Sequence, residues 1–240
     1  MTEHGTLYGL GVGPGDPELL TLKAHRILQS APVIAYPAPA TGDGGGDSMA
    51  RAIAAPHIPA DRTEIAILTP MTPGPFPAND VYDRYAAEIG DHLAAGRDVA
   101  LLCEGDPFLY GSFMYVFDRL AERFPCEVVP GVSSLGACAA RAGAPLVSRN
   151  QVLTIVPAPL PEDDLRRRLA ETDAAAVMKV GRHLTKVRNV LSDLGRLDGA
   201  WYVERATMEA ETVKPLAEVD LETAPYFSMI LVRHADAGGR

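Results

Sequence analysis

The stretch Leu7–Pro17 reads LYGLGVGPGDP, in which an apolar segment runs directly into a loop of glycine, proline and aspartate. Apolar residues at helical spacing follow between Leu19 and Leu28. The pattern predicts a buried strand, a tight loop and a helix. This unit is the building block of α/β sheets, so the stretch already indicates the class of fold.

The same order of strand, loop and helix recurs twice downstream. Val99–Cys103 is a fully apolar run of strand length, typical of a strand covered on both faces, and it leads into Glu104–Pro107. Glu127–Val129 is a further expected strand, and it leads into Pro130–Ser134. The other elements expected in this half are strands at Val33–Tyr36 and Ile65–Leu68 and helices at Val81–Ala95, Phe113–Arg123 and Leu135–Ala142.

This alternation predicts an open, mostly parallel sheet, and ligands of such sheets bind at the carboxyl ends of the strands. Three loops, those after Val12, Cys103 and Val129, occupy that position, so we expect them to converge on one site. Two other segments, Pro37–Asp47 and Thr69–Asn79, have little to bury. We expect both segments to be loops and the first of them to be mobile. They either close over a bound ligand as lids or are surface loops without a function.

After Pro145 the alternation continues with new elements. The expected helices are Pro161–Glu171 and His183–Leu194. The expected strands are Val152–Val156, Ala175–Val180, Ala200–Val203, an edge strand at Thr212–Val213, and Phe227–Val232. No internal repeat is recognisable. The expected fold class is therefore α/β with two domains, an N-terminal domain of residues 1–145 and a smaller C-terminal domain of residues 146–240.

The composition limits the function classes. The chain has 240 residues, of which 47% are hydrophobic, enough for one long domain or two small ones. Its formal net charge is 22 basic minus 31 acidic residues, or −9. Since affinity for phosphate groups comes mostly from Lys and Arg, this balance argues against general binding of nucleic acid or anionic membranes.

Cysteine and histidine positions indicate no metal centre. The three cysteines lack CxxC spacing and the six histidines lack metal-ligand spacing, so we expect neither a disulfide scaffold nor a tight metal site. The N-terminus lacks a basic segment followed by an apolar run, and no apolar stretch approaches the ~20 residues of a spanning helix. We expect a cytoplasmic protein.

The first of these loops is a poor phosphate cradle. The Gly9–Asp16 segment lacks the sixth-position glycine of a dinucleotide fingerprint and the Gly-Lys-Ser/Thr of a nucleotide-triphosphate loop. Pro14 and Pro17 also remove N–H donors. Glu104 and Asp106 add carboxylates, which accept hydrogen bonds from ribose hydroxyls or an amine and attract a positive charge. Each motif alone also fits a plain turn. Together they favour a ligand with adenine, ribose, an amino acid and a sulfonium over ATP or NAD.

At this point the motifs carry a resemblance. Five segments in this order resemble signatures of the tetrapyrrole methylases, the S-adenosylmethionine-dependent family of cobalamin and siroheme biosynthesis. They are Gly11–Ala24 (GVGPGDPELLTLKA), Glu104–Ser112 (EGDPFLYGS), Val129–Ser134 (VPGVSS), Lys179–Gly181 and Glu204–Thr207. The resemblance runs from about Leu7 to Val232. It implies two α/β domains with a ligand cleft between them, a homodimer, and a tetrapyrrole as the small-molecule partner.

The resemblance also assigns residues. It implies S-adenosyl-L-methionine as methyl donor and S-adenosylhomocysteine as product. The matching donor-binding positions are Pro14, Glu104, Gly105, Asp106, Leu109, Tyr110, Ser133, Ser134, Val180, Ala206 and Thr207. Apart from these matches, the substrate-binding candidates are Tyr36, as a wall of the substrate site, and the basic residues Arg51, Lys179 and Arg182, as partners for substrate carboxylates. No metal ligand is among them.

Several variants within the motifs, including Ala35–Pro37 and Tyr226–Met229, look most like the precorrin-2 C20-methyltransferases. The implied reaction is methyl transfer to C20 of precorrin-2 or its cobalt form. Methylation at C11 or C17 is an alternative, and so is a non-catalytic nucleotide-binding module. Pro37 stands where the uroporphyrinogen methylases have an aspartate, which removes the obvious base. Tyr36 and Glu104 are the remaining catalytic candidates.

A substrate with several carboxylates calls for a local cationic rim in this acidic chain. Five basic residues against one acid, Asp193, lie between residues 179 and 196. They are Lys179, Arg182, Lys186, Arg188 and Arg196. Arg51 and Arg149 could add to this rim, and a solvated helix face is the alternative.

Overall fold

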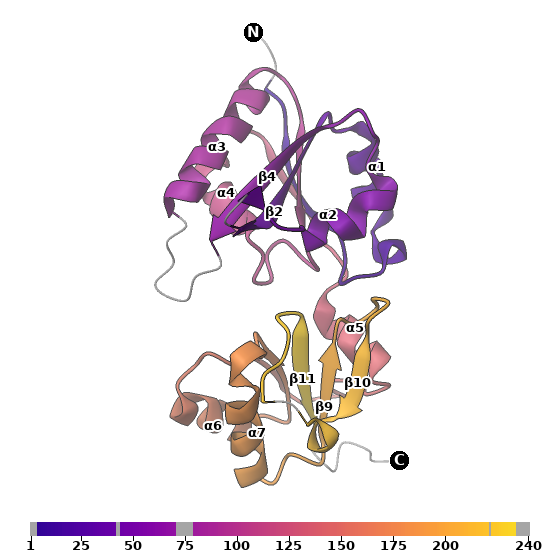
Figure 1. The fold of residues 1–240 in the computed structure, drawn as a ribbon, viewed down its shortest axis with the longest axis vertical. Helices are drawn as coiled ribbons and strands as arrows, with labels where there is room; N and C mark the ends of the chain where they lie inside the picture. The colour runs from indigo at the N-terminus through magenta and orange to yellow at the C-terminus, as the bar shows by residue number, and fades with distance from the viewer. Residues whose placement is uncertain (1–3, 42–43, 71–78, 221, 234–240) are drawn as a thin grey trace. The chain divides into compact units, whose positions relative to one another are not determined.

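The computed structural model describes residues 4–41, 44–70, 79–220 and 222–233. The chain divides into two compact units, Met1–Ser133 and Ser134–Arg240 (Figure 1). Each unit has its own sheet and its own buried core, and each is considered by itself below. Within the described residues, every helix is too short or too polar to span a lipid bilayer.

The first unit is built on a six-stranded sheet in which β4 also pairs with β2. Its strands are β1 (Leu7–Gly11), β2 (Val33–Thr41), β3 (Gly44–Gly45), β4 (Thr63–Pro70), β5 (Val99–Cys103) and β6 (Cys126–Val129), in the path β3-β2-β5-β1-β6. All pairings are parallel except that of β2 with β3. The expected parallel sheet is therefore confirmed.

Strand β5 lies near the middle of this sheet and is buried at every position. Its five apolar residues face helices on both sides, as the continuous apolar run predicts. The helices of this unit are α1 (Leu22–Ser30), α2 (Met49–Ala54), α3 (Asn79–Ala94) and α4 (Phe113–Leu120). Figure 1 shows α3 and α4 on one face of the sheet and α1 and α2 on the other.

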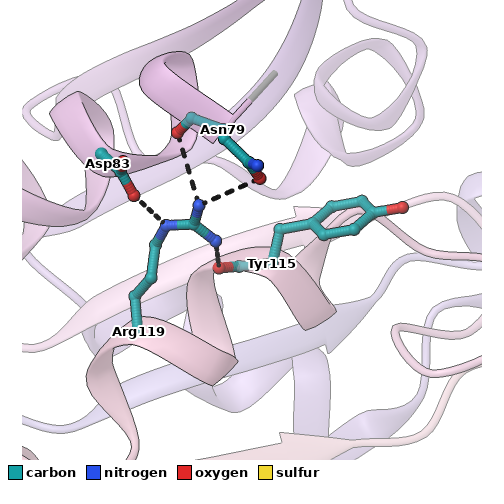
Figure 2. A network of polar contacts seen from close by, with 4 residues as sticks. All are labelled: Asn79, Asp83, Tyr115 and Arg119. Carbon is teal, nitrogen blue, oxygen red and sulfur yellow. Dashed lines mark hydrogen bonds and ion pairs between the residues drawn. The ribbon is translucent and has the colours of Figure 1, made fainter. Parts of the chain in front are cut away.

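Helices α3 and α4 are held together by apolar packing and by one arginine. Tyr82, Ile89 and Leu93 lie on the buried side of α3 and pack in the same core as the buried residues of α4. At the surface, Arg119 Nε donates to Asp83 Oδ1 at 2.6 Å and Arg119 Nη1 donates to the Tyr115 carbonyl at 2.7 Å (Figure 2). The same guanidinium also donates to Asn79, the first residue of α3.

One sequence prediction about this unit is wrong. Pro37 was expected to open a mobile loop, but β2 continues from Tyr36 to Thr41, and Pro37–Ala40 pair with Ile67–Pro70 of β4. Strand β5 pairs only with Val33–Ala35 and β3 pairs only with Ala40–Thr41, so β4 is the strand that pairs with β2 at Pro37. Proline is tolerated where its missing N–H would face away from a partner strand. The second expected loop is also shorter than predicted, because Thr69 and Pro70 belong to β4 and Asn79 begins α3. Residues 42–43 and 71–78 lie outside the described part.

The second unit contains a five-stranded mixed sheet. Its strands are β7 (Leu153–Pro157), β8 (Ala174–Met178), β9 (Ala200–Glu204), β10 (Thr212–Pro215) and β11 (Ser228–Arg233), in the order β10-β9-β11-β8-β7. Strands β7 and β8 are parallel, and β11 runs antiparallel to both β8 and β9. Strands β7, β8 and β9 therefore point the same way, and their carboxyl ends share one edge of the sheet.

The two faces of this sheet pack against different helices. Ala175 and Val177 of β8 pack with residues of α6 (Glu162–Ala170) and α7 (Leu184–Asp193), whereas Ala176 between them packs with residues of α5 (Ser134–Arg141). This alternation follows from the two-residue period of a strand. Because the small side chains of α5 pack on this sheet, the division of the chain falls at Ser133, earlier than the boundary expected at residue 145.

Candidate functional site

Three loops of the first unit converge at the carboxyl ends of β1, β5 and β6, as the sequence predicts. Strand β1 pairs with β5 on one side and β6 on the other, which brings the loops that follow them together. Val12 N donates to the Cys103 carbonyl at 2.9 Å, and Gly105 N donates to the Gly13 carbonyl at 2.8 Å. The first and second loops therefore form a short bridge beyond the sheet.

Glycine is needed where the loops touch. A Cβ atom at Gly131 would overlap the Gly105 carbonyl oxygen and lie 2.7 Å from the Gly11 Cα. A Cβ atom at Gly11 would lie 2.5 Å from the Gly131 Cα and 2.6 Å from the Gly105 carbonyl oxygen. The three backbones are thus in direct contact, and any side chain at these two positions would force them apart.

The carboxylate of Asp106 ties the second loop to the third. Asp106 Oδ2 accepts from Gly131 N at 3.1 Å, and Asp106 Oδ1 accepts from Phe108 N at 2.9 Å. Both oxygens therefore accept from backbone N–H groups within the loops. The sequence predicts Asp106 as a donor-binding residue, and the structure gives its side chain the further task of fixing loop geometry.

Glu104 connects the same loop to helix α2. Its Oε1 accepts from Ala50 N at 3.1 Å, close to the start of α2. Burial raises the pKa of Glu104 above its ordinary value of 4.5, while N–H groups of Ala50 and of Glu104 itself act in the opposite direction. The raised pKa makes Glu104 a better proton acceptor than an exposed carboxylate would be.

Other predicted donor positions lie on these loops. Pro14 is buried, and Leu109 and Ser133 are partly buried. Tyr110 is exposed and has a left-handed backbone with φ of 58°, which is uncommon for a bulky side chain and is found disproportionately at functional sites. The segments 11–17, 103–112 and 129–134 contain Asp16, Glu104 and Asp106 but no Lys, Arg or His. Such loops suit a neutral or cationic ligand better than a polyphosphate.

Tyr36 and Arg51 meet through a residue that sequence reasoning missed. Arg51 Nε donates to Glu64 Oε2 and Arg51 Nη2 donates to Glu64 Oε1, both at 2.9 Å, so the pair is bidentate. Burial, followed by the hydrogen bond to Glu64, raises the pKa of Tyr36, and the hydrogen bond from Arg51 lowers the pKa of Glu64. At neutral pH Tyr36 is therefore a phenol and Glu64 a carboxylate. Tyr36 is a weak candidate for the base.

In the second unit, the predicted donor residues lie at the shared carboxyl edge of β8 and β9. Val180 follows β8 and is fully buried, while Ala206 and Thr207 follow β9. Arg205 N donates to the Phe227 carbonyl, immediately before β11, at 2.8 Å. These loops therefore form one group at one edge of the second sheet.

The expected cationic rim is only partly present. Lys179 and Arg182 are exposed at the edge of the second sheet that carries Val180. Arg196, in contrast, donates to the carbonyls of Leu169, Thr172 and Asp173 and so fixes the chain between α6 and β8. Lys186 likewise donates to the Leu160 carbonyl at 2.6 Å. Arg196 and Lys186 therefore have structural partners of their own.

Comparison with known proteins assigns the family. The family model described as Tetrapyrrole (Corrin/Porphyrin) Methylases matches residues 6–220. The chain belongs to this family of methyltransferases, and the resemblance carried by the five sequence motifs is confirmed.

Individual relatives are similar over nearly their whole length. A precorrin-2 C(20)-methyltransferase from Sinorhizobium sp is 46% identical, covering 95% of this chain and 95% of that protein. A cobalt-precorrin-2 C(20)-methyltransferase from Salmonella typhimurium is 34% identical, covering 95% and 96%. The solved uroporphyrin-III C-methyl transferase from Thermus thermophilus, complexed with S-adenyl homocysteine, has a TM-score of 0.68 at 28% identity, covering 95% and 97%. The fold class expected from the sequence is confirmed.

The contact between the loops can be tested at Gly131. We expect Gly131→Ala to lower the free energy of unfolding by at least about 2 kcal/mol, because the new Cβ overlaps the Gly105 carbonyl oxygen. Gly136→Ala is the matched control, since a Cβ there has no neighbouring atom within 4 Å and α5 would gain roughly 0.5–1 kcal/mol from the better helix former. Urea unfolding of both variants measures the difference. Equal stability of the two variants would contradict the close contact.

The raised pKa of Glu104 predicts a pH dependence of stability. The unfolded chain releases this proton near pH 4.5 and the folded chain holds it to higher pH, so the carboxyl lowers the free energy of unfolding as pH rises through that window. Glu104→Gln has no proton to lose, and its amide oxygen still accepts from Ala50 N. The variant should therefore gain stability relative to the wild type as pH rises above 4.5, as measured by urea unfolding. A constant difference would show that Glu104 is not desolvated.

Proposed function

We propose that the protein transfers a methyl group from S-adenosyl-L-methionine to C20 of precorrin-2 or its cobalt form, in cobalamin biosynthesis. It is a C-methyltransferase of the tetrapyrrole methylase family. The observation that carries the proposal is the convergence of three loops without basic residues at the carboxyl ends of β1, β5 and β6, in a chain whose relatives of 46% and 34% identity are named C20-methyltransferases.

The loops of the first unit fit the proposed donor chemically. Asp16, Glu104 and Asp106 give them negative charge, and no basic residue is present to bind a phosphate. The complex of the Thermus thermophilus relative with S-adenyl homocysteine supports the same kind of ligand. Pro14, Gly105, Leu109, Tyr110 and Ser133 are the residues of these loops proposed to contact it. Ser134, Val180, Ala206 and Thr207 of the second unit are proposed donor contacts as well.

The chemistry requires alignment more than acid–base power. When bound, S-adenosyl-L-methionine supplies a methyl group on a sulfonium sulfur whose leaving group is a neutral thioether. The protein's task is to hold the nucleophilic carbon in line at about 3–3.5 Å and to exclude water, which contributes roughly 7–11 kcal/mol to lowering the barrier. Rigid loops locked by Gly11, Gly131 and Asp106 are suited to that task.

Loss of the proton from the methylated C20 calls for a proton acceptor, and Glu104 is the better of the two candidates. Burial raises the pKa of Glu104 above its ordinary value, whereas the raised pKa of Tyr36 keeps its phenol protonated. Tyr36 is proposed instead to line the substrate site next to Arg51. The homodimer and the cytoplasmic location remain predictions of the family resemblance and of the sequence.

The regiochemistry of the product tests the proposed function. The protein is incubated with precorrin-2, or with its cobalt form, and with donor carrying a ¹³C methyl group. We expect one labelled methyl group per product by mass spectrometry and its assignment to C20 by carbon NMR. A labelled methyl group at C11 or C17 would contradict the assigned position, and no transfer to either substrate would contradict the proposed substrate class.

Two basic positions test the substrate side, namely the exposed Arg182 and the partly exposed Arg51, which is paired with Glu64. Arg182→Ala and Arg51→Ala should each raise the KM for the tetrapyrrole about 3- to 10-fold through loss of a charge-assisted hydrogen bond to a substrate carboxylate, with the KM for the donor unchanged. Arg168→Ala removes an exposed arginine from helix α6 and is the control. Steady-state kinetics with each substrate varied in turn would measure both constants. A change in the donor KM, or none in the tetrapyrrole KM, would place the substrate elsewhere.

A further inference from the structure

The backbone around Ala206 is strained, and Ala206 is one of the proposed donor contacts. Arg205 and Thr207, on either side of it, both have left-handed backbones, with φ of 47° and 69°. That conformation is unfavourable for residues other than glycine, and more so for a β-branched one such as Thr207. It persists only where neighbouring groups hold it in place.

Glu211 is one of the groups that hold it. Its Oε2 accepts from Thr207 N at 2.6 Å, four residues back along the chain. The Arg205 end of the segment is held separately by the bond from Arg205 N to the Phe227 carbonyl at 2.8 Å. Ala206 therefore lies between two anchored peptide groups, and one of those anchors is a side chain that can be replaced.

Glu211 also reaches helix α5. Arg141, the last residue of α5, donates through Nε to both carboxylate oxygens at 2.7 and 2.8 Å, and its Nη2 lies 2.7 Å from Oε1. The carboxylate of Glu211 is mostly buried, and the arginine lowers its pKa, so it stays ionised at neutral pH. The first residue of α5 is Ser134, another proposed donor contact.

We propose that Glu211 is a positioning residue for methyl-donor binding, because its carboxylate accepts from Thr207 N and so fixes the strained peptide beside Ala206. The inference rests on the proposed function, since it takes Ala206 and Thr207 as donor contacts. Glu211 itself touches neither substrate in this account. Its effect is to keep the strained segment in the conformation that the donor binds.

The ion pair and the Thr207 bond can be separated by substitution. Arg141→Met removes the ion pair and leaves Glu211 to accept from Thr207 N. The double variant Arg141→Glu with Glu211→Arg restores an ion pair of opposite orientation, but an arginine cannot accept from an N–H group. Glu211→Ala removes both interactions. Glu209→Gln, an equal change of charge at an exposed position two residues away, is the control.

The affinity of each full-length variant for S-adenosylhomocysteine is measured by titration calorimetry, alongside its melting temperature. We expect Glu211→Ala and the double variant to weaken binding about tenfold, and Arg141→Met and Glu209→Gln to change it less than twofold. The melting temperature should fall in Glu211→Ala and Arg141→Met and recover in the double variant. Steady-state kinetics should show the same rise in KM for the donor, with kcat and the tetrapyrrole KM changed less than twofold.

The outcomes separate this role from a purely structural one. If the double variant recovers affinity together with melting temperature, the ion pair is all that matters and the inference is overturned. The same holds if Arg141→Met loses as much affinity as Glu211→Ala, or if no variant loses affinity. If Glu211→Ala does not fold, the double variant alone decides. If the wild type itself does not bind S-adenosylhomocysteine, both the proposed function and this inference are contradicted. If the wild type binds normally and the variants bind equally well, only this inference is contradicted.

Discussion

The contact between three backbones at Gly11, Gly105 and Gly131 is the constraint on which the site of the first unit depends. Parallel pairing of β1 with β5 and β6 brings the three loops to one edge, but only residues without side chains at Gly11 and Gly131 let them touch. Asp106 then fixes their spacing by accepting from Gly131 N. The result is a rigid, negatively charged surface made largely of peptide groups.

The second unit reaches a similar arrangement by a different route. Its sheet is mixed, yet β7, β8 and β9 point the same way, so the loops containing Val180 and Ala206 share one edge. Here a side chain, Glu211, rather than a set of glycines, holds the strained peptide beside Ala206. In both units the proposed ligand contacts are on loops whose shape is fixed by contacts within the protein itself.

Sequence reasoning was most accurate where apolar patterning is unambiguous. Val99–Cys103 is predicted as a doubly covered strand and forms β5 with those bounds, because five consecutive apolar residues suit a strand that is buried on both faces. The predictions failed where the role of a residue depends on partners that are distant in the sequence. Pro37 marks a break in the sequence, but pairing with β4 alone tolerates it. Glu64 and Glu211 could not be recognised, since their arginine partners lie 13 and 70 residues away.

A crystal structure of the protein with S-adenosylhomocysteine would test the central claim most directly. The account predicts ligand density against the peptide groups of Gly13–Pro14, Gly105–Asp106 and Gly131–Ser133, with no basic side chain of these loops in contact. Density located away from the ends of β1, β5 and β6, or loops that separate when the ligand binds, would contradict it.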